Sequence, residues 1–177
     1  AIDAEVNEAN AMAISTISEE GTPRSRYVLF KDIVDNKLVF YSDYGSSKGQ
    51  EMENNPNISG LFFWPELHRQ IRLEGVVSKT SDEVSDNYFA SRPRGAQLSA
   101  IASSQSTEIE GRETVEDRIK ELEIEFEGKD IPRPDNWGGY AIDISFWEFW
   151  QGRRSRTHDR FIYVKNDNSW EITRLSP

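Results

Sequence analysis

The sequence contains no cysteine and only two histidines, His68 and His158, in 177 residues. The lack of cysteine excludes a disulfide scaffold, a thiol nucleophile, and thiolate ligation of zinc or an iron–sulfur cluster. Two histidines are too few for a histidine-rich metal site, so we expect no metal centre. No apolar run approaches the roughly 18 residues of a membrane-spanning helix, so we expect no membrane partner.

Positive charge is scarce, with 21 Lys and Arg against 31 Asp and Glu, a formal net charge of −10. Nucleic-acid binding is not expected, because neutralising phosphates requires a basic face. Neither a G-x-G-x-x-G fingerprint nor a P-loop is present, which removes the common nucleotide cradles. No secretory signal is visible, so we expect a cytoplasmic protein, although a start at Ala1 without Met is compatible with a missing N-terminal segment.

The length favours one domain over residues 1–177. A chain of this size can bury about 70% of its unfolded surface, enough for a core without covalent staples. Aromatic residues make up 11% of the chain, and this content argues against disorder.

Strand-like segments separated by turn signals dominate the chain, and three segments are helix-like. We predict strands at 12–17, 24–31, 38–41, 57–64, 70–78, 140–150, 161–164 and 170–173. We predict helices at 46–54, at 80–90 with a capping box from Thr80 to Glu83, and at 113–126. About eight strands and three or four helices that do not strictly alternate indicate an α+β fold. In such a fold an antiparallel sheet curls into a barrel and helices pack outside it.

Arginine clusters are the informative anomaly in an acidic chain. The first, Arg24, Arg26 and Lys31, lies on one predicted strand, and even spacing places Arg24 and Arg26 on the same face. The second is Arg92-Pro93-Arg94, after a predicted helix. Guanidinium groups suit phosphate or carboxylate recognition, but a polar strand face and a charge at a helix end explain these two clusters equally well.

The third cluster spans 151–160, with four arginines, His158 and one acid directly after an aromatic strand. Its composition suggests a phosphorylated aromatic ligand, and a solvated arginine loop is the alternative. Gly45-Ser46-Ser47-Lys48 resembles a helix start that holds a phosphate, a weak signal alone. Hydrolytic chemistry is less well supported, because no G-x-S-x-G elbow occurs and no pair of acids stands out.

Taken together, these segments resemble the pyridoxine/pyridoxamine 5′-phosphate oxidases. The most specific piece is Phe149-Trp150-Gln151-Gly152 followed by Arg156-Thr157-His158-Asp159-Arg160, which resembles the family's F-W-Q-G…R-L-H-D-R signature. Supporting pieces in the same order are Arg26-Tyr27-Val28-Leu29-Phe30-Lys31, Phe40-Tyr41-Ser42, Asn54-Asn55-Pro56, Arg69-Gln70, Tyr88 to Arg94, Gln105-Ser106, Trp137-Gly138-Gly139 and Arg174-Leu175-Ser176-Pro177. The resemblance covers about residues 10–177.

The resemblance implies an FMN-binding split β-barrel with peripheral helices, forming a homodimer in which FMN lies in clefts at the subunit interface. The segment at about 137–177 would serve dimerisation and hold the substrate. Implied FMN contacts are Arg26, Tyr27, Val28, Leu29, Phe30, Lys31, Tyr41, Ser42, Ser47, Lys48, Gln70, Gln105, Ser106, Trp150 and Arg160. Implied substrate contacts are Lys31, Tyr88, Arg92, Arg156 and His158, of which Arg156 and His158 would hold the ring over the flavin.

The implied reaction oxidises pyridoxine 5′-phosphate or pyridoxamine 5′-phosphate to pyridoxal 5′-phosphate. Dioxygen accepts the electrons and yields hydrogen peroxide, and the amine substrate also releases ammonia. Three residues depart from the family pattern: Ala96 replaces a Ser, Ser47 replaces an Arg and Thr157 replaces a Leu. Ala96 keeps open a flavin-dependent oxidase of another ring compound, as in phenazine biosynthesis, and a non-catalytic flavin-binding module is a further alternative.

Overall fold

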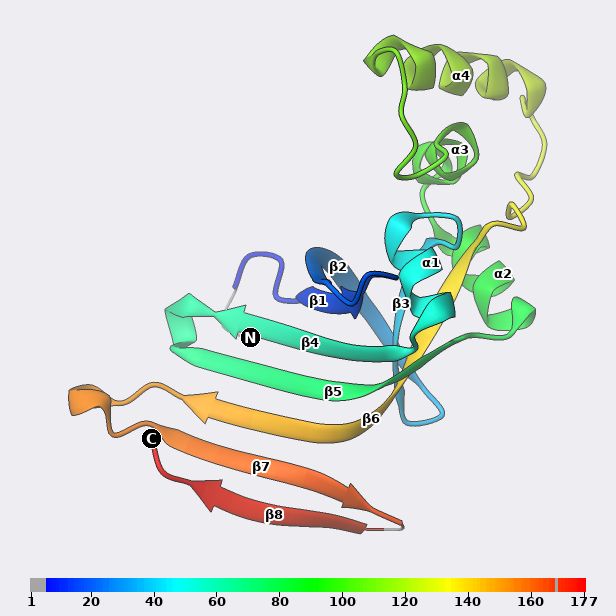
Figure 1. Ribbon diagram of the computed structural model, residues 1–177. Helices are drawn as coiled ribbons and strands as arrows, with labels where there is room; N and C mark the ends of the chain where they lie inside the picture. The colour runs from blue at the N-terminus through cyan, green and yellow to red at the C-terminus, as the bar shows by residue number, and fades with distance from the viewer. Residues whose placement is uncertain (1–5, 168) are drawn as a thin grey trace.

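The structure is a computed structural model that describes residues 6–167 and 169–177. The described residues form eight strands, four α-helices and two short 3₁₀ turns (Figure 1). The strands are β1 (Ala11–Ile17), β2 (Pro23–Val34), β3 (Lys37–Asp43), β4 (Asn57–Trp64), β5 (Arg69–Lys79), β6 (Trp137–Gln151), β7 (Asp159–Asn166) and β8 (Ser169–Leu175). The helices are α1 (Ser47–Asn54), α2 (Asp82–Ser91), α3 (Arg94–Ala102) and α4 (Arg112–Glu125), and the 3₁₀ turns are η2 (Pro65–Leu67) and η3 (Arg154–Arg156).

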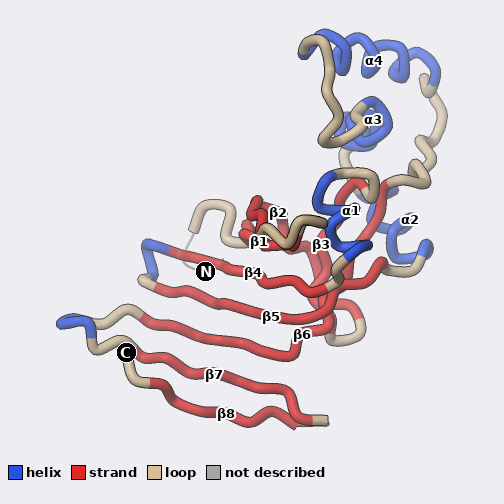
Figure 2. The backbone as a smooth tube through the Cα atoms, in the orientation of Figure 1, coloured by secondary structure: helices blue, strands red, loops and turns tan. Residues whose placement is uncertain are grey.

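All strand pairs are antiparallel, in the order β3-β2-β1-β4-β5-β6-β7-β8. The first half of β6 also pairs with β3, from Leu38↔Ile142 to Asp43↔Trp137, and this pairing closes six strands into a barrel. The second half of β6 leaves the barrel and pairs with β7, so β7 and β8 extend the sheet away from the helices (Figure 2). The predicted α+β split barrel with peripheral helices is confirmed.

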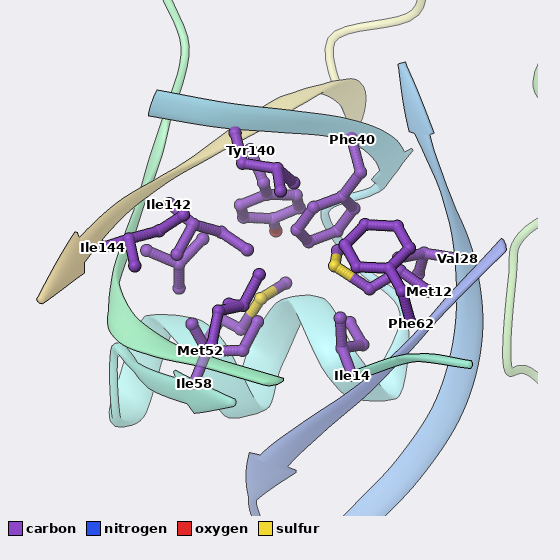
Figure 3. Packing of buried hydrophobic residues seen from close by; sticks show 13 residues of the cluster. Met12, Ile14, Val28, Phe40, Met52, Ile58, Phe62, Tyr140, Ile142 and Ile144 are labelled. Atoms are coloured by element: carbon purple, nitrogen blue, oxygen red, sulfur yellow. The ribbon is translucent and has the colours of Figure 1, made fainter. Parts of the chain in front are cut away.

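Alternate residues of the strands point into the barrel and form its apolar core. On β1, Met12, Ile14 and Thr16 are fully buried while their neighbours are half-buried, the period-2 pattern of a strand with one face on a core. Figure 3 shows the cluster in which Phe40 and Tyr140 stack at a centroid distance of 5.4 Å. These packed rings fix the relative positions of β3 and β6 on either side of the barrel closure.

A second apolar cluster lies outside the barrel and attaches the helices to β6. It contains Phe89 of α2, Leu98 of α3, Leu122 of α4, Ile131 and Trp137. Because Trp137 is the first residue of β6, this cluster holds α2 and α3 beside the start of that strand (Figure 1). None of the helices in the described residues is long and apolar enough to span a bilayer.

Most predicted elements are confirmed with shifted ends, and two expectations are wrong in detail. The N-cap of α2 is Ser81, which accepts a hydrogen bond from Val84 N at 3.3 Å, rather than Thr80. Thr80 is instead tied to β6, because its main-chain N–H donates to Gly139 O at 2.9 Å. Helix α3 was not among the predicted helices: Pro93 reads as a helix stop, but it also begins a new helix directly afterwards.

Close packing explains why the two residues near the start of β6 are glycines. A Cβ on Gly138 would collide with the hydroxyl of Tyr44, and a Cβ on Gly139 would lie 2.5 Å from Thr80 Oγ1. The sequence Trp137-Gly138-Gly139 therefore lets β3 and the start of α2 approach the strand closely.

Candidate active site

A pocket of about 550 Å³ lies where β2, β3, α2 and α3 meet. Seven of the predicted site residues line it: Leu29, Lys31, Tyr41, Ser42, Tyr88, Arg92 and Gln105. Its complete lining is Leu29, Lys31, Tyr41, Ser42, Asp43, Tyr88, Arg92, Pro93, Ala96, Ser99, Ala100, Ser103, Gln105 and Trp137. Side chains up to 108 residues apart in the chain are thus gathered in one place.

Lys48 is held at the edge of this pocket by three neighbours. Its ammonium group donates to Ser42 Oγ at 2.8 Å, to Ser46 Oγ at 3.0 Å and to Gln105 Oε1 at 2.5 Å. Burial, reinforced by the nearby charge of Arg26, lowers the pKa of Lys48 to about 8. A partly desolvated ammonium group beside a second cation is a favourable position for an anion such as phosphate.

Arg26 is fixed by a buried carboxylate that the sequence analysis did not single out. Glu51 of α1 is 5% exposed, and its Oε2 accepts from Arg26 NH2 at 2.8 Å while Oε1 accepts from Arg24 NH1 at 3.1 Å. Although burial raises it, hydrogen bonds from Thr16 and Arg26 hold the pKa of the Glu51 carboxyl below its ordinary value. The prediction that Arg24 and Arg26 share one strand face is confirmed.

A stack of aromatic rings lines the pocket. The rings of Tyr41 and Tyr88 lie 3.7 Å apart at 11°, and Trp137 stacks on Tyr41 at 5.6 Å. The guanidinium of Arg92 lies over Trp137 at 4.6 Å. Arg92 NH1 is buried and has no hydrogen-bond partner among the described residues, and burial lowers the pKa of this guanidinium. A buried donor on a cation, left unpaired in a pocket, indicates an anionic ligand.

Strand β2 alternates between the barrel core and the outside. Val28 is buried in the core, and the partly buried Phe30 packs against it. Tyr27, Leu29 and Lys31 point the other way and are exposed. Ser47, Gln105 and Ser106 are also exposed, at the start of α1 and in the segment after α3.

The remaining predicted site residues form a separate group at the far end of β6. Gln70, Trp150 and Arg160 are direct neighbours across β5, β6 and β7, so their side chains share one face of the sheet. His158 packs on Trp150 with ring centroids 4.7 Å apart. We call Gln70, Trp150, Arg156, His158 and Arg160 the sheet-end cluster, and Lys31, Tyr41, Ser42, Lys48, Tyr88, Arg92 and Gln105 the pocket cluster.

A second unexpected acid supports the sheet-end cluster. Glu148 is 5% exposed, and it accepts from Arg160 Nε at 2.7 Å and pairs with Arg72 NH2 at 3.2 Å. Like Glu51, it is one of 31 acidic residues that the local sequence does not distinguish from one another. Only pairing between distant strands distinguishes it, so local sequence carried no signal for either carboxylate.

Arg156 and His158 lie on and just after turn η3, whose backbone is unusual. Ser155 and Arg156 have φ values of 56° and 61°, two consecutive non-glycine residues in the left-handed region. Such residues are held against a conformational cost by their surroundings and occur often at functional sites. The turn is the orange segment beyond the end of β6 in Figure 1.

The two clusters lie at opposite ends of β6. Trp137, the first residue of that strand, lines the pocket, whereas Trp150 comes thirteen residues later. At about 3.3 Å per residue, about 40 Å of strand separates them. Figure 1 shows the same separation, with α2 and α3 at one end of β6 and η3 at the other. The predicted residues are thus brought together as two half-sites, and one chain does not join them.

Comparison with known proteins adds an independent result. The pyridoxamine 5′-phosphate oxidase family profile matches residues 1–125, and the profile of the pyridoxine 5′-phosphate oxidase C-terminal dimerisation region matches residues 137–177. The pyridoxine/pyridoxamine 5′-phosphate oxidase of Flavobacterium johnsoniae is 51% identical over 170 residues, which is 96% of this chain and 79% of that protein. That of Rubrobacter xylanophilus is 48% identical over 100% of this chain and 82% of its own length.

Solved structures agree. PhzG from Burkholderia lata 383, in complex with tetrahydrophenazine-1-carboxylic acid, superposes with a TM-score of 0.94 at 31% identity, over 99% of this chain and 86% of that one. A pyridoxamine 5′-phosphate oxidase-related, FMN-binding protein from Nostoc punctiforme shares the fold, with a TM-score of 0.79 at 17% identity over 98% of this chain and 91% of that one. The chain belongs to the pyridoxine/pyridoxamine 5′-phosphate oxidase family.

Proposed function

We propose that this protein uses FMN to oxidise pyridoxine 5′-phosphate or pyridoxamine 5′-phosphate to pyridoxal 5′-phosphate. Dioxygen is the electron acceptor, hydrogen peroxide is the co-product, and the amine substrate also releases ammonia. The observation that carries the proposal is the pocket cluster, in which unpaired positive charge, stacked aromatic rings and a cavity of about 550 Å³ coincide. These features suit a flat ring that carries a phosphate.

The residues present fit a phosphorylated flavin. Lys48 and Arg26 place two cations close together beside the hydroxyl of Ser42 and the amide of Gln105. The family pattern has an Arg where this chain has Ser47, so we assign the FMN phosphate mainly to Lys48 and Arg26. When bound, FMN supplies the redox chemistry, accepting a hydride from the substrate and passing the electrons to dioxygen.

The chain's own residues then bind and orient the substrate. Lys31, Tyr88 and Arg92 all line the pocket, and we assign the substrate phosphate to them. The unpaired NH1 of Arg92 supplies a donor that a phosphate oxygen would satisfy. Arg156 and His158 hold the substrate ring, a positioning role that lowers the barrier by fixing the reacting carbon against the cofactor.

The separation of the two half-sites leads us to propose a homodimer with two composite sites. The pocket cluster of one subunit would face the sheet-end cluster of its partner, so that each FMN contacts Gln70, Trp150 and Arg160 from the second chain. The match of residues 137–177 to a dimerisation region supports this arrangement. Because β6 belongs both to the barrel and to that region, we treat residues 1–177 as one domain. The cytoplasmic location stays a prediction.

Two kinds of variant test the assignment. Lys48→Ala is expected to lose FMN during gel filtration, whereas Arg156→Ala and His158→Ala are expected to keep FMN and to lose most turnover. Flavin retention is read from the visible absorbance, and turnover from pyridoxal 5′-phosphate formation. Full FMN retention by Lys48→Ala would remove Lys48 from the phosphate site, and unchanged turnover in both other variants would refute the assigned substrate contacts.

Ala96 favours one alternative function, the oxidation of a different ring compound. It lines the pocket where the family pattern has a Ser that helps hold the substrate phosphate. A missing hydrogen bond is worth about 0.5–1.5 kcal/mol. Restoring it in Ala96→Ser is therefore expected to lower the KM for pyridoxine 5′-phosphate by about 2- to 12-fold. No change in KM, combined with turnover of an unphosphorylated tricyclic substrate, would favour the alternative.

A further inference from the structure

The imidazole of His158 is held in one hydrogen-bonding state by its own turn. The main-chain N–H of Arg153 donates to His158 Nδ1 at 3.1 Å. The ring also packs on Trp150 at a centroid distance of 4.7 Å and 44°, which restricts its rotation. No hydrogen bond reaches Nε2 within the described part of the chain, so this nitrogen is left for a ligand.

The direction of that hydrogen bond fixes the position of the proton. A main-chain N–H is always a donor, so Nδ1 must offer its lone pair. In a neutral imidazole the proton is then on Nε2. The other tautomer would place two N–H groups against each other, and imidazolium would do the same.

Several contacts hold the Arg153 N–H in place. Arg153 Nε donates to Asp159 Oδ2 at 2.7 Å, and Asp159 Oδ1 accepts from Arg174 NH2 at 2.5 Å. Inside the turn, Thr157 Oγ1 donates to Arg154 O at 2.9 Å. These contacts stabilise a loop whose backbone at Ser155 is in the left-handed region, and they keep residue 153 opposite residue 158.

We infer that His158 acts toward the substrate as a neutral Nε2–H hydrogen-bond donor, and that Arg153 is a positioning residue that selects this tautomer through its main-chain N–H. The inference rests on the proposed function and extends it, because it assigns the polarity of one substrate contact. His158 then recognises an acceptor atom on the ligand ring. It does not serve as a proton acceptor, because the Nε2 lone pair needed for that role exists only in the tautomer that the Arg153 N–H disfavours.

The tautomer can be read directly, because the chain has only two histidines. A long-range ¹H–¹⁵N correlation spectrum of the FMN-loaded protein with ¹⁵N-labelled histidine is recorded at pH 8, where an ordinary imidazole is neutral. His68→Gln assigns the two signal sets. We expect a protonated Nε2 and an unprotonated Nδ1 for His158. A protonated Nδ1, alone or as part of imidazolium, would overturn the inference whether or not the protein turns over pyridoxine 5′-phosphate.

Two isosteric variants test the same point by function. The Gln amide nitrogen can reach the position of Nε2, whereas the Asn amide nitrogen reaches only that of Nδ1. His158→Gln is expected to keep kcat/KM within about tenfold of the parent, and His158→Asn is expected to fall to the level of His158→Ala. Flavin absorbance confirms that each variant is folded and loaded. Retention in His158→Asn alone, or equal loss in both variants, would contradict a donor at the Nε2 position.

The Arg153→Ala variant separates the effect of the Arg153 main-chain N–H from that of its guanidinium. This variant keeps the main-chain N–H and removes the guanidinium together with its bond to Asp159, while the hydrogen bond from Thr157 to Arg154 O inside the turn remains. The ¹⁵N pattern of His158 is therefore expected to stay that of the Nε2–H tautomer. A mixture of tautomers would show that the main-chain N–H does not select the state without the guanidinium, and would refute the role assigned to the main chain alone.

Discussion

Replacing Glu148 by Gln removes the charge of a buried carboxylate and nearly preserves its shape. The Glu148 side chain is 6% exposed and lies between Arg160 Nε at 2.7 Å and Arg72 NH2 at 3.2 Å. The substituted amide can still accept from one arginine, but its NH₂ group would face the other. The change therefore removes one charge-assisted hydrogen bond and leaves two like charges without their shared counterion.

The expected cost follows from burial. Breaking a fully buried ion pair costs about 3–5 kcal/mol, and a hydrogen bond to a charged group contributes about 1.5–3 kcal/mol. Arg72 and Arg160 are 44% and 32% exposed, so water compensates them in part. We expect Glu148→Gln to lower the free energy of unfolding by about 2 kcal/mol. For a chain of this size, this corresponds to a fall in Tm of about 4–8 °C.

Thermal unfolding followed by circular dichroism measures this effect, and Glu74→Gln is the matched control. Glu74 pairs with the same Arg72, but at 3.8 Å and with its side chain 52% exposed, so its contribution is within about 1 kcal/mol. FMN affinity, measured by quenching of flavin fluorescence, should also weaken in Glu148→Gln, because Arg160 loses its anchor. Equal Tm values for the two variants would refute the argument that burial makes Glu148 structurally important.

Three further predictions concern titration and the core. FMN affinity should weaken as pH rises through about 8, because the phosphate needs the protonated Lys48. The pH dependence of FMN affinity should flatten in Lys48→Arg. An unchanged pH dependence in that variant would exclude Lys48 as the titrating group. Because the pKa of Glu51 is lowered in the folded protein, its ionisation stabilises the fold at pH values above 4.5, the ordinary pKa, and this stability is lost as pH falls through the folded-state pKa. The difference in Tm between the parent and Glu51→Gln should therefore narrow below that pH. A Tm difference that does not change with pH would contradict this prediction. Tyr140→Phe removes a buried hydroxyl that has no partner among the described residues, so Tm should stay level or rise, whereas a fall of several degrees would show that the hydroxyl is bonded.

Local sequence patterns were sufficient to predict most of the barrel. Turn signals on both sides predicted the strand at 57–64 with its observed bounds, and helical spacing predicted the helix that runs from Arg112 to Glu125. Strand β6 extends three residues further toward the N-terminus than predicted, because Trp137-Gly138-Gly139 looks like a turn. Its strand conformation depends on pairing with β3, which lies nearly 100 residues away in the sequence.

The candidate site was predictable only in part. The family resemblance assigned Gln70, Trp150 and Arg160 to one site, and the register of β5, β6 and β7 places these three side chains side by side. The acids that hold the arginines, Glu51 and Glu148, could not be found in this way. Their importance comes from burial against arginines that lie far away in the sequence, and the local sequence around them does not show it.

The most direct test of the proposed function is an anaerobic reduction. The protein is reconstituted with FMN, freed of excess flavin, and mixed without oxygen with pyridoxine 5′-phosphate while the visible flavin band is recorded. The account predicts that the band bleaches, that it returns when air is admitted, and that pyridoxal 5′-phosphate is formed. A bound flavin that bleaches with neither pyridoxine 5′-phosphate nor pyridoxamine 5′-phosphate would contradict it.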